Sequence, residues 1–70
     1  MRDKDFVICV IYAPKNILYV HSYNEDIVKF TKSMFLAKGY KNRDSCLHAI
    51  DDIDNLFDFP FDMKLIERCS

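Results

Sequence analysis

The chain has 70 residues and a formal net charge of -1; half of its residues are apolar, 14% are aromatic and 30% are charged. This composition is typical of one small globular domain and excludes a disordered or low-complexity chain. No apolar run reaches the ~20 residues that span a bilayer, and the N-terminus has no signal-peptide pattern. We therefore expect a cytoplasmic protein without a membrane partner.

Three cysteines, Cys9, Cys46 and Cys69, make an odd count, which argues against a disulfide framework. A metal site would need these thiols to converge with His21 or His48, but no cysteine pair has the C-x-x-C spacing of a structural zinc site. We therefore expect neither a metal nor another cofactor. Because so small a domain buries only a modest fraction of its surface, we expect a second subunit to supply extra stability.

Three segments have the residue pattern of strands. Residues 5–13 are apolar at both odd and even positions, which predicts a central strand buried on both faces. Residues 14–16 predict a turn, and residues 17–21 an antiparallel partner for the first strand. Residues 63–69 predict a third strand, whose Lys and Arg side chains suit an edge or a half-solvated face.

A first helix is predicted over residues 23–38, because Ser22 and Glu25 have the spacing of a capping box. Gly39, the only glycine of the chain, is expected just after this helix in the left-handed conformation. The apolar stripe of this helix would consist of Ile27, Phe30, Met34 and Ala37.

A second helix is predicted to begin near Asn42 or Asp44, either of which can cap it, and to end at about Phe57. Pro60 prevents the helix from continuing toward the third strand. The inward stripe of this helix would consist of Cys46, Ile50, Ile53 and Phe57.

These elements predict an α+β domain of order β-β-α-α-β, with a three-stranded sheet of order 2-1-3 and two helices. Two short helices cover one face of such a sheet, which leaves one apolar row of the strand at residues 5–13 exposed. An exposed apolar row usually marks an interface, so we expect a homodimer through that face or along an edge strand. The alternative is that the helices cover one face each and the monomer is complete.

Charge is segregated along the chain. Residues 1–24 sum to +1, residues 25–43 to +3, residues 44–62 to -6 and residues 63–70 to +1. The acidic segment contains no Lys or Arg, and all six of its acids are aspartates. Aspartate is a poor helix former, and negative charge near a helix C-terminus is unfavourable. Helix stability therefore does not explain the acidic segment.

Short carboxylates held on a helix can substitute for the phosphates of a nucleic acid and occupy a basic groove. The sequence therefore predicts a non-catalytic protein-binding module. We expect it to be an inhibitor that places residues 44–62 on a basic, nucleic-acid-facing surface of a nucleic-acid-processing protein. Aromatic residues between the acids would add contact area. The predicted contact residues are Asp44, Asp51, Asp52, Asp54, Asp58, Phe57, Phe59 and Phe61.

Three alternatives to this prediction remain, of which two give the acids and aromatic residues a structural role only. The acids can form a solvated helix face that keeps a small protein soluble, and the aromatic residues can be core. A third is functional: a basic corner that binds nucleic acid, formed by Lys29, Lys32, Lys38, Lys41 and Arg43. A chain of net charge -1 with an acidic flank is poorly suited to bind duplex nucleic acid directly.

No catalytic motif is present in the sequence. Glycine-rich phosphate loops are missing, and neither histidine has a recognisable nucleophile spacing, so we do not expect an enzyme. No family identifies itself by a motif, but short length, segregated charge and a lack of catalytic motifs are typical of small inhibitors and adaptors, including those that viruses make against host proteins. A viral protein that acts on DNA metabolism in the host cytoplasm fits this format.

Overall fold

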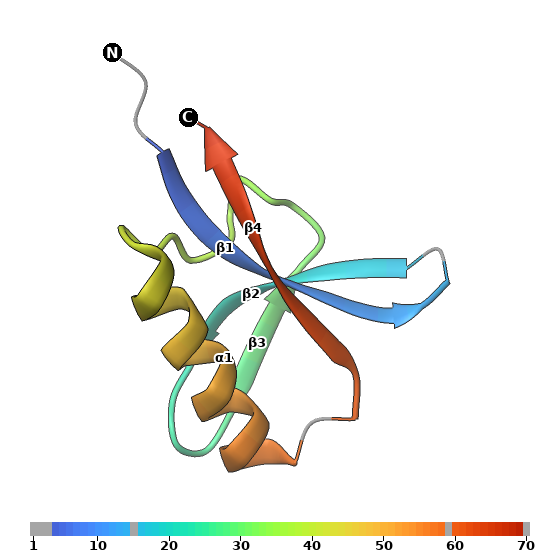
Figure 1. Ribbon diagram of the computed structural model, residues 1–70. Coiled ribbons are helices and arrows are strands. Elements are labelled where there is room, and N and C mark those ends of the chain that lie inside the picture. The colour runs from blue at the N-terminus through green and yellow to red at the C-terminus, as the bar shows by residue number, and fades with distance from the viewer. Residues whose placement is uncertain (1–3, 15, 59, 70) are drawn as a thin grey trace.

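The computed structural model describes residues 4–14, 16–58 and 60–69. It contains four strands and one helix: β1 (Lys4–Ala13), β2 (Asn16–Tyr23), β3 (Val28–Thr31), α1 (Arg43–Phe57) and β4 (Asp62–Cys69) (Figure 1). The strands form one antiparallel sheet of order β3-β2-β1-β4. The α+β character is as predicted, but the expected three-stranded sheet with two helices is wrong.

The central strand and its two neighbours follow the sequence pattern. β1 pairs with β2 on one side, from Cys9 opposite Tyr19, and with β4 on the other, from Lys4 opposite Cys69 to Ile11 opposite Asp62. Residues 7–10 of β1 are at most 2% exposed. The prediction of a central strand buried on both faces is therefore confirmed, as are the hairpin and the edge strand β4.

The predicted first helix does not form. β2 continues through Ser22, and a tight turn at residues 24–27 leads into β3. The side-chain Oδ1 of Asn24 accepts hydrogen bonds from the backbone N–H groups of Asp26 (2.8 Å) and Ile27 (3.0 Å). Together with the hydrogen bond from the Asn24 N–H to the Ile27 carbonyl (2.9 Å), these bonds close a turn that places Val28 opposite Tyr23 in the sheet.

The sequence after the turn also favours a strand. Val28 and Phe30 pack against the core while Lys29 between them is exposed, which is the period of two that a strand requires. Gly39 therefore follows no helix, and its φ is not positive. Residues 32–42 form an irregular segment, here named the covering segment, that links β3 to α1.

The predicted second helix is confirmed as α1. Its N-cap is Asn42, whose Oδ1 accepts a hydrogen bond from the backbone N–H of Ser45 at 2.8 Å. The helix packs against β1 and β4 and buries Cys46, Ala49 and Ile53. These side chains form the core together with three from the sheet: Ile8, Val10 and Val20.

The covering segment accounts for the second face of β1. Val7 and Cys9 point away from α1 because residues alternate along a strand, yet they are only 0% and 2% exposed. Arg68 shares their face and binds backbone carbonyls of the covering segment, in which Ala37 is buried. The expectation of an exposed apolar row is therefore wrong for these positions. The homodimer stays a prediction, without this support.

The burial of α1 predicts a clear contrast between two substitutions on the same helix. Ile53 is fully buried, so Ile53→Ala should lower the free energy of unfolding in urea by about 2–5 kcal/mol through lost contacts and a cavity. Leu56 is 49% exposed, so Leu56→Ala should cost less than about 1 kcal/mol. Equal losses would contradict the orientation of the helix.

Candidate functional site

Five aspartates project from α1 and its C-terminal cap, and all are exposed: Asp44, Asp51, Asp52, Asp54 and Asp58. Residues seven positions apart lie on one side of a helix, so Asp44 and Asp51 face the same way, about 10 Å apart along the axis. Since each residue turns a helix by about 100°, Asp52 and Asp54 lie on opposite flanks of this row, and Asp58 follows at the C-cap. These five residues are named the acidic face.

The acidic face is not neutralised by the part of the fold that the structure describes. The ion pairs there join Lys4 to Glu67 (3.3 Å) and Arg68 to Asp5, and neither includes an aspartate of the acidic face. The last turn of α1 contains no basic residue, and Asp58 adopts the left-handed conformation with φ 47°. Asp52 accepts a hydrogen bond from the Tyr23 hydroxyl at 3.3 Å.

The aromatic residues predicted to accompany the acids lie elsewhere. Phe57 is half-buried and packs against the core. Phe61 is 41% exposed and stacks edge-to-face on Tyr12, with 6.1 Å between ring centroids. Phe59 lies outside the described residues. The predicted acids are thus exposed on α1 and its cap, whereas Phe57 packs against the core.

The predicted basic corner is spread over three parts of the chain. Lys29 lies on β3 and Arg43 is the first residue of α1, while Lys32, Lys38 and Lys41 belong to the covering segment. All five side chains are exposed. The Nζ of Lys38 lies 5.4 Å from the centre of the Tyr40 ring, a cation–π distance.

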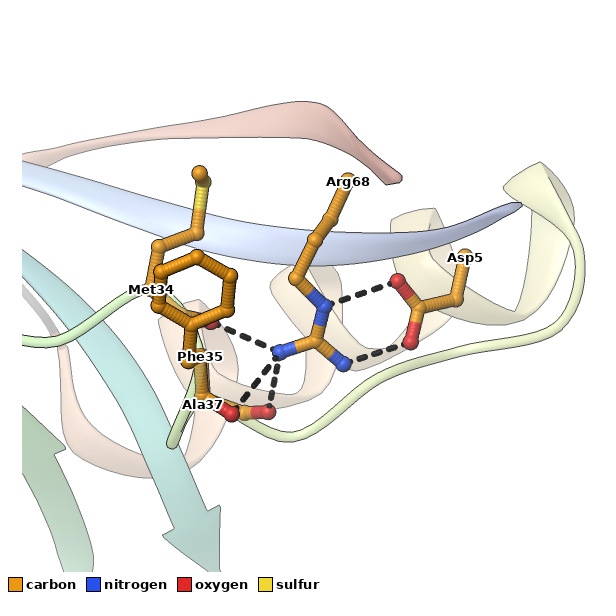
Figure 2. Close-up of polar contacts among 5 residues, drawn as sticks. All are labelled: Asp5, Met34, Phe35, Ala37 and Arg68. Carbon is orange, nitrogen blue, oxygen red and sulfur yellow. Dashed lines mark hydrogen bonds and ion pairs between the residues drawn. The ribbon is translucent and has the colours of Figure 1, made fainter. Parts of the chain in front are cut away.

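Sequence reasoning missed a clamp that holds the covering segment. The Nη1 of Arg68 donates hydrogen bonds to the carbonyls of Met34 (2.7 Å) and Ala37 (2.9 Å), with Phe35 O at 3.5 Å (Figure 2). The Nε and Nη2 of Arg68 donate to the two carboxylate oxygens of Asp5. We name Arg68 and Asp5 the clamp.

The clamp explains the glycine that the sequence analysis assigned to a helix end. A Cβ atom at Gly39 would lie 2.1 Å from Oδ2 of Asp5 and 2.6 Å from Nη2 of Arg68. Gly39 therefore leaves space for the two clamp side chains, and its φ is not left-handed. A lone glycine together with opposite charges on two strands was the available signal, but residue spacing does not show that they meet.

The covering segment also exposes two large apolar side chains in succession. Phe35 is 79% exposed and Leu36 is 64% exposed, more than any other large apolar residue in the described chain. We name these two residues the apolar tip. Both residues lie within the helix predicted over residues 23–38 but outside its predicted apolar stripe.

The segment C-terminal to the apolar tip is fixed to the edges of β1 and β2. The backbone N–H and carbonyl of Tyr40 exchange hydrogen bonds with the carbonyl and N–H of Phe6 at 2.8 and 2.9 Å. The N–H of Lys38 donates to the carbonyl of Val20 at 3.0 Å. The covering segment therefore fills the space where β1 and β2 diverge.

Buried titratable groups near α1 stay neutral at physiological pH. Burial raises the pKa of the Cys46 thiol to about 11 and that of the Tyr40 hydroxyl to about 12. The Tyr40 hydroxyl has no hydrogen-bond partner in the described part of the chain. A protonated thiol is a poor nucleophile, so Cys46 acts here as a core residue.

In the described ranges no three His, Cys, Asp or Glu side chains are placed to hold a metal ion. No helix there has the length and apolarity needed to cross a membrane. The chain matches no protein-family model, no curated protein and no solved structure. Any functional proposal therefore depends on the geometry described above.

The contact between Gly39 and the clamp predicts a context-dependent effect on stability. Gly39→Ala should lower the free energy of unfolding by about 1–3 kcal/mol, because the new methyl group displaces the Asp5 carboxylate. In an Asp5→Ala background the same substitution should cost less, since the nearest atom is gone. An equal cost in both backgrounds, measured by urea unfolding, would contradict the steric explanation.

The clamp also predicts a pH dependence of stability. Hydrogen bonds from Arg68 hold the pKa of the Asp5 carboxyl below its ordinary value of 3.8. A lowered pKa in the folded state stabilises the fold above that ordinary value, and the stabilisation is lost as the pH falls through the lowered pKa. The free energy of unfolding should therefore fall more steeply below pH 3.8 in the wild type than in Asp5→Asn. If the free energy of unfolding fell with pH in parallel for the wild type and Asp5→Asn, the proposed contribution of the Asp5 carboxylate would be wrong.

Proposed function

We propose that the protein is a non-catalytic binding module whose acidic face occupies a basic, nucleic-acid-facing surface of a partner protein. The observation that supports this most directly is the exposure of five aspartates on α1 and its cap, none in an ion pair within the described residues. Unpaired charge of one sign on one surface attracts a partner of opposite sign and speeds their encounter.

The placement of the carboxylates supports recognition over local stability. Asp54 and Asp58 lie at the C-terminal end of α1, where the helix dipole opposes negative charge by about 0.3–1 kcal/mol each. No basic residue in the last turn offsets that cost. A face that served only solubility could carry its acids at exposed positions where the helix dipole does not oppose them. The positions of Asp54 and Asp58 are therefore better explained by contact with a partner.

The rigidity of α1 also supports the proposal. Aspartate has a short side chain, so its carboxylate stays close to the backbone that carries it. The helix is anchored by Cys46, Ala49 and Ile53, which are at most 3% exposed, and is capped by Asn42. The carboxylates are therefore held in a fixed array, which lowers the entropy lost on binding.

The proposal predicts which substitutions remove the partner. The protein should capture a nucleic-acid-processing protein from lysate, and duplex DNA should release it by competing for the same basic surface. Asp51→Asn/Asp52→Asn/Asp54→Asn should weaken capture by roughly tenfold or more, because all three carboxylates contribute to the electrostatic attraction to the basic surface. The matched control is Glu25→Gln/Asp26→Asn/Glu67→Gln, which removes the same net charge away from α1 and should retain the partner.

Two outcomes would contradict the proposal. Retention of the partner by the helix triple variant would exclude the acidic face as the contact. Salt-sensitive binding of duplex DNA by the protein itself would favour the basic corner instead. Far-UV circular dichroism of each variant shows that the fold is intact.

A further inference from the structure

The apolar tip is held in place from beneath by the clamp. The Nη1 nitrogen of Arg68 has two hydrogens, and its two short hydrogen bonds go to the carbonyls of Met34 and Ala37, on either side of the tip. The N–H of Leu36 donates to Ser33 O at 3.2 Å, and the N–H of Ala37 donates to Met34 O at 3.4 Å. The carbonyls of Met34 and Ala37 and the N–H groups of Leu36 and Ala37 are thus satisfied within the chain, while two large apolar side chains are exposed.

The clamp also removes the charge cost of bringing this loop into an apolar environment. The guanidinium of Arg68 is paired with both carboxylate oxygens of Asp5, and the Arg68 side chain is 12% exposed. A paired, hydrogen-bonded charge tolerates a low dielectric far better than a lone one. The paired Arg68 and Asp5 side chains beneath the tip therefore carry no net charge, and the Arg68 side chain is already largely shielded from water.

Basic residues flank the tip along the chain. Residues 27–43 contain five basic residues and no acidic residue. Lys32 and Lys38 lie three positions to either side of Phe35, and both are exposed. Their long side chains can bury the methylene groups beside an apolar tip and keep the ammonium groups at a polar boundary.

We propose that the apolar tip inserts into a membrane surface that contains anionic lipid, with Lys32 and Lys38 binding the lipid headgroups. Apolar residues combined with a basic cluster are the two signals that peripheral attachment requires. This proposal is independent of the acidic face. It revises the expectation of no membrane partner, which was based on the lack of a spanning segment.

Two observations favour lipid over a pocket in another protein. Lipid offers no hydrogen bonds to a loop, so an inserted loop must satisfy its own backbone, as the clamp does for Met34 and Ala37. A protein pocket could supply such bonds itself. In addition, α1 packs on the face of β1 opposite to Asp5 and Arg68, so the sheet lies between the helix that carries the acidic face and the clamp beneath the tip.

A fluorescent reporter tests the insertion directly. The chain has no tryptophan, so Phe35→Trp introduces a single indole at the tip. Its emission should shift to shorter wavelength with phosphatidylcholine vesicles that contain about a quarter phosphatidylserine. Vesicles of phosphatidylcholine alone should leave it unchanged. Leu47→Trp, on the exposed side of α1, is the control and should not shift with either vesicle.

Vesicle co-sedimentation of unlabelled variants separates the apolar and the electrostatic contributions. Phe35→Ser/Leu36→Ser should abolish binding to the anionic vesicles, whereas Leu47→Ser/Leu56→Ser, which also removes two exposed leucine-sized side chains, should retain it. Lys32→Gln/Lys38→Gln should weaken binding roughly tenfold or more and reduce its sensitivity to salt.

Three results would overturn the proposal. The first is no association of the folded wild type with anionic vesicles, which would favour a protein pocket with an acidic rim as the binding partner of the tip. The second is undiminished binding by Phe35→Ser/Leu36→Ser. The third is equal binding to vesicles with and without phosphatidylserine, since the lysines would then have no role.

Discussion

The guanidinium of Arg68 makes it possible for an irregular loop to cover one face of the sheet. β1 is apolar on both sides, and α1 covers only the side of Ile8 and Val10. Val7 and Cys9 on the other side are buried as well, on the face where Arg68 holds the covering segment. A loop in that position has carbonyls that must be satisfied, and Arg68 satisfies two of them while Asp5 balances its charge.

The same arrangement separates two surfaces of opposite character. The acidic face lies on the exposed side of α1, whereas the apolar tip lies in the part of the covering segment that the clamp holds on the other face of β1. The basic residues of segment 25–43 and the aspartates of segment 44–62 form no ion pair with each other within the described chain. A molecule of this kind can present each surface to a different partner, which is the basis of the two proposals.

The local pattern of apolar and capping residues predicted strands and helices correctly where it agreed with the tertiary environment. The doubly apolar run at residues 5–13 predicted β1, and Asn42 with the stripe through Ile53 predicted α1. The pattern failed over residues 23–38, where Ile27, Phe30 and Met34 have helical spacing. There the side chain of Asn24 forms a turn, and Phe30 packs beside Val20 on a strand. The aspartates were placed correctly because their helix was.

The sequence alone determined the central strand, the helix with its exposed acids and the segregation of charge, because each depends on residues that are near one another along the chain. The tertiary structure alone decided that residues 28–31 form strand β3 of the sheet, what Gly39 contacts, and that Phe35 and Leu36 are exposed. Each of these depends on contacts between distant residues: Asp5, Gly39 and Arg68 meet only after β1 and β4 have paired. Until that pairing is known, the spacing of residues 23–38 fits a helix as well as it fits a strand and a loop.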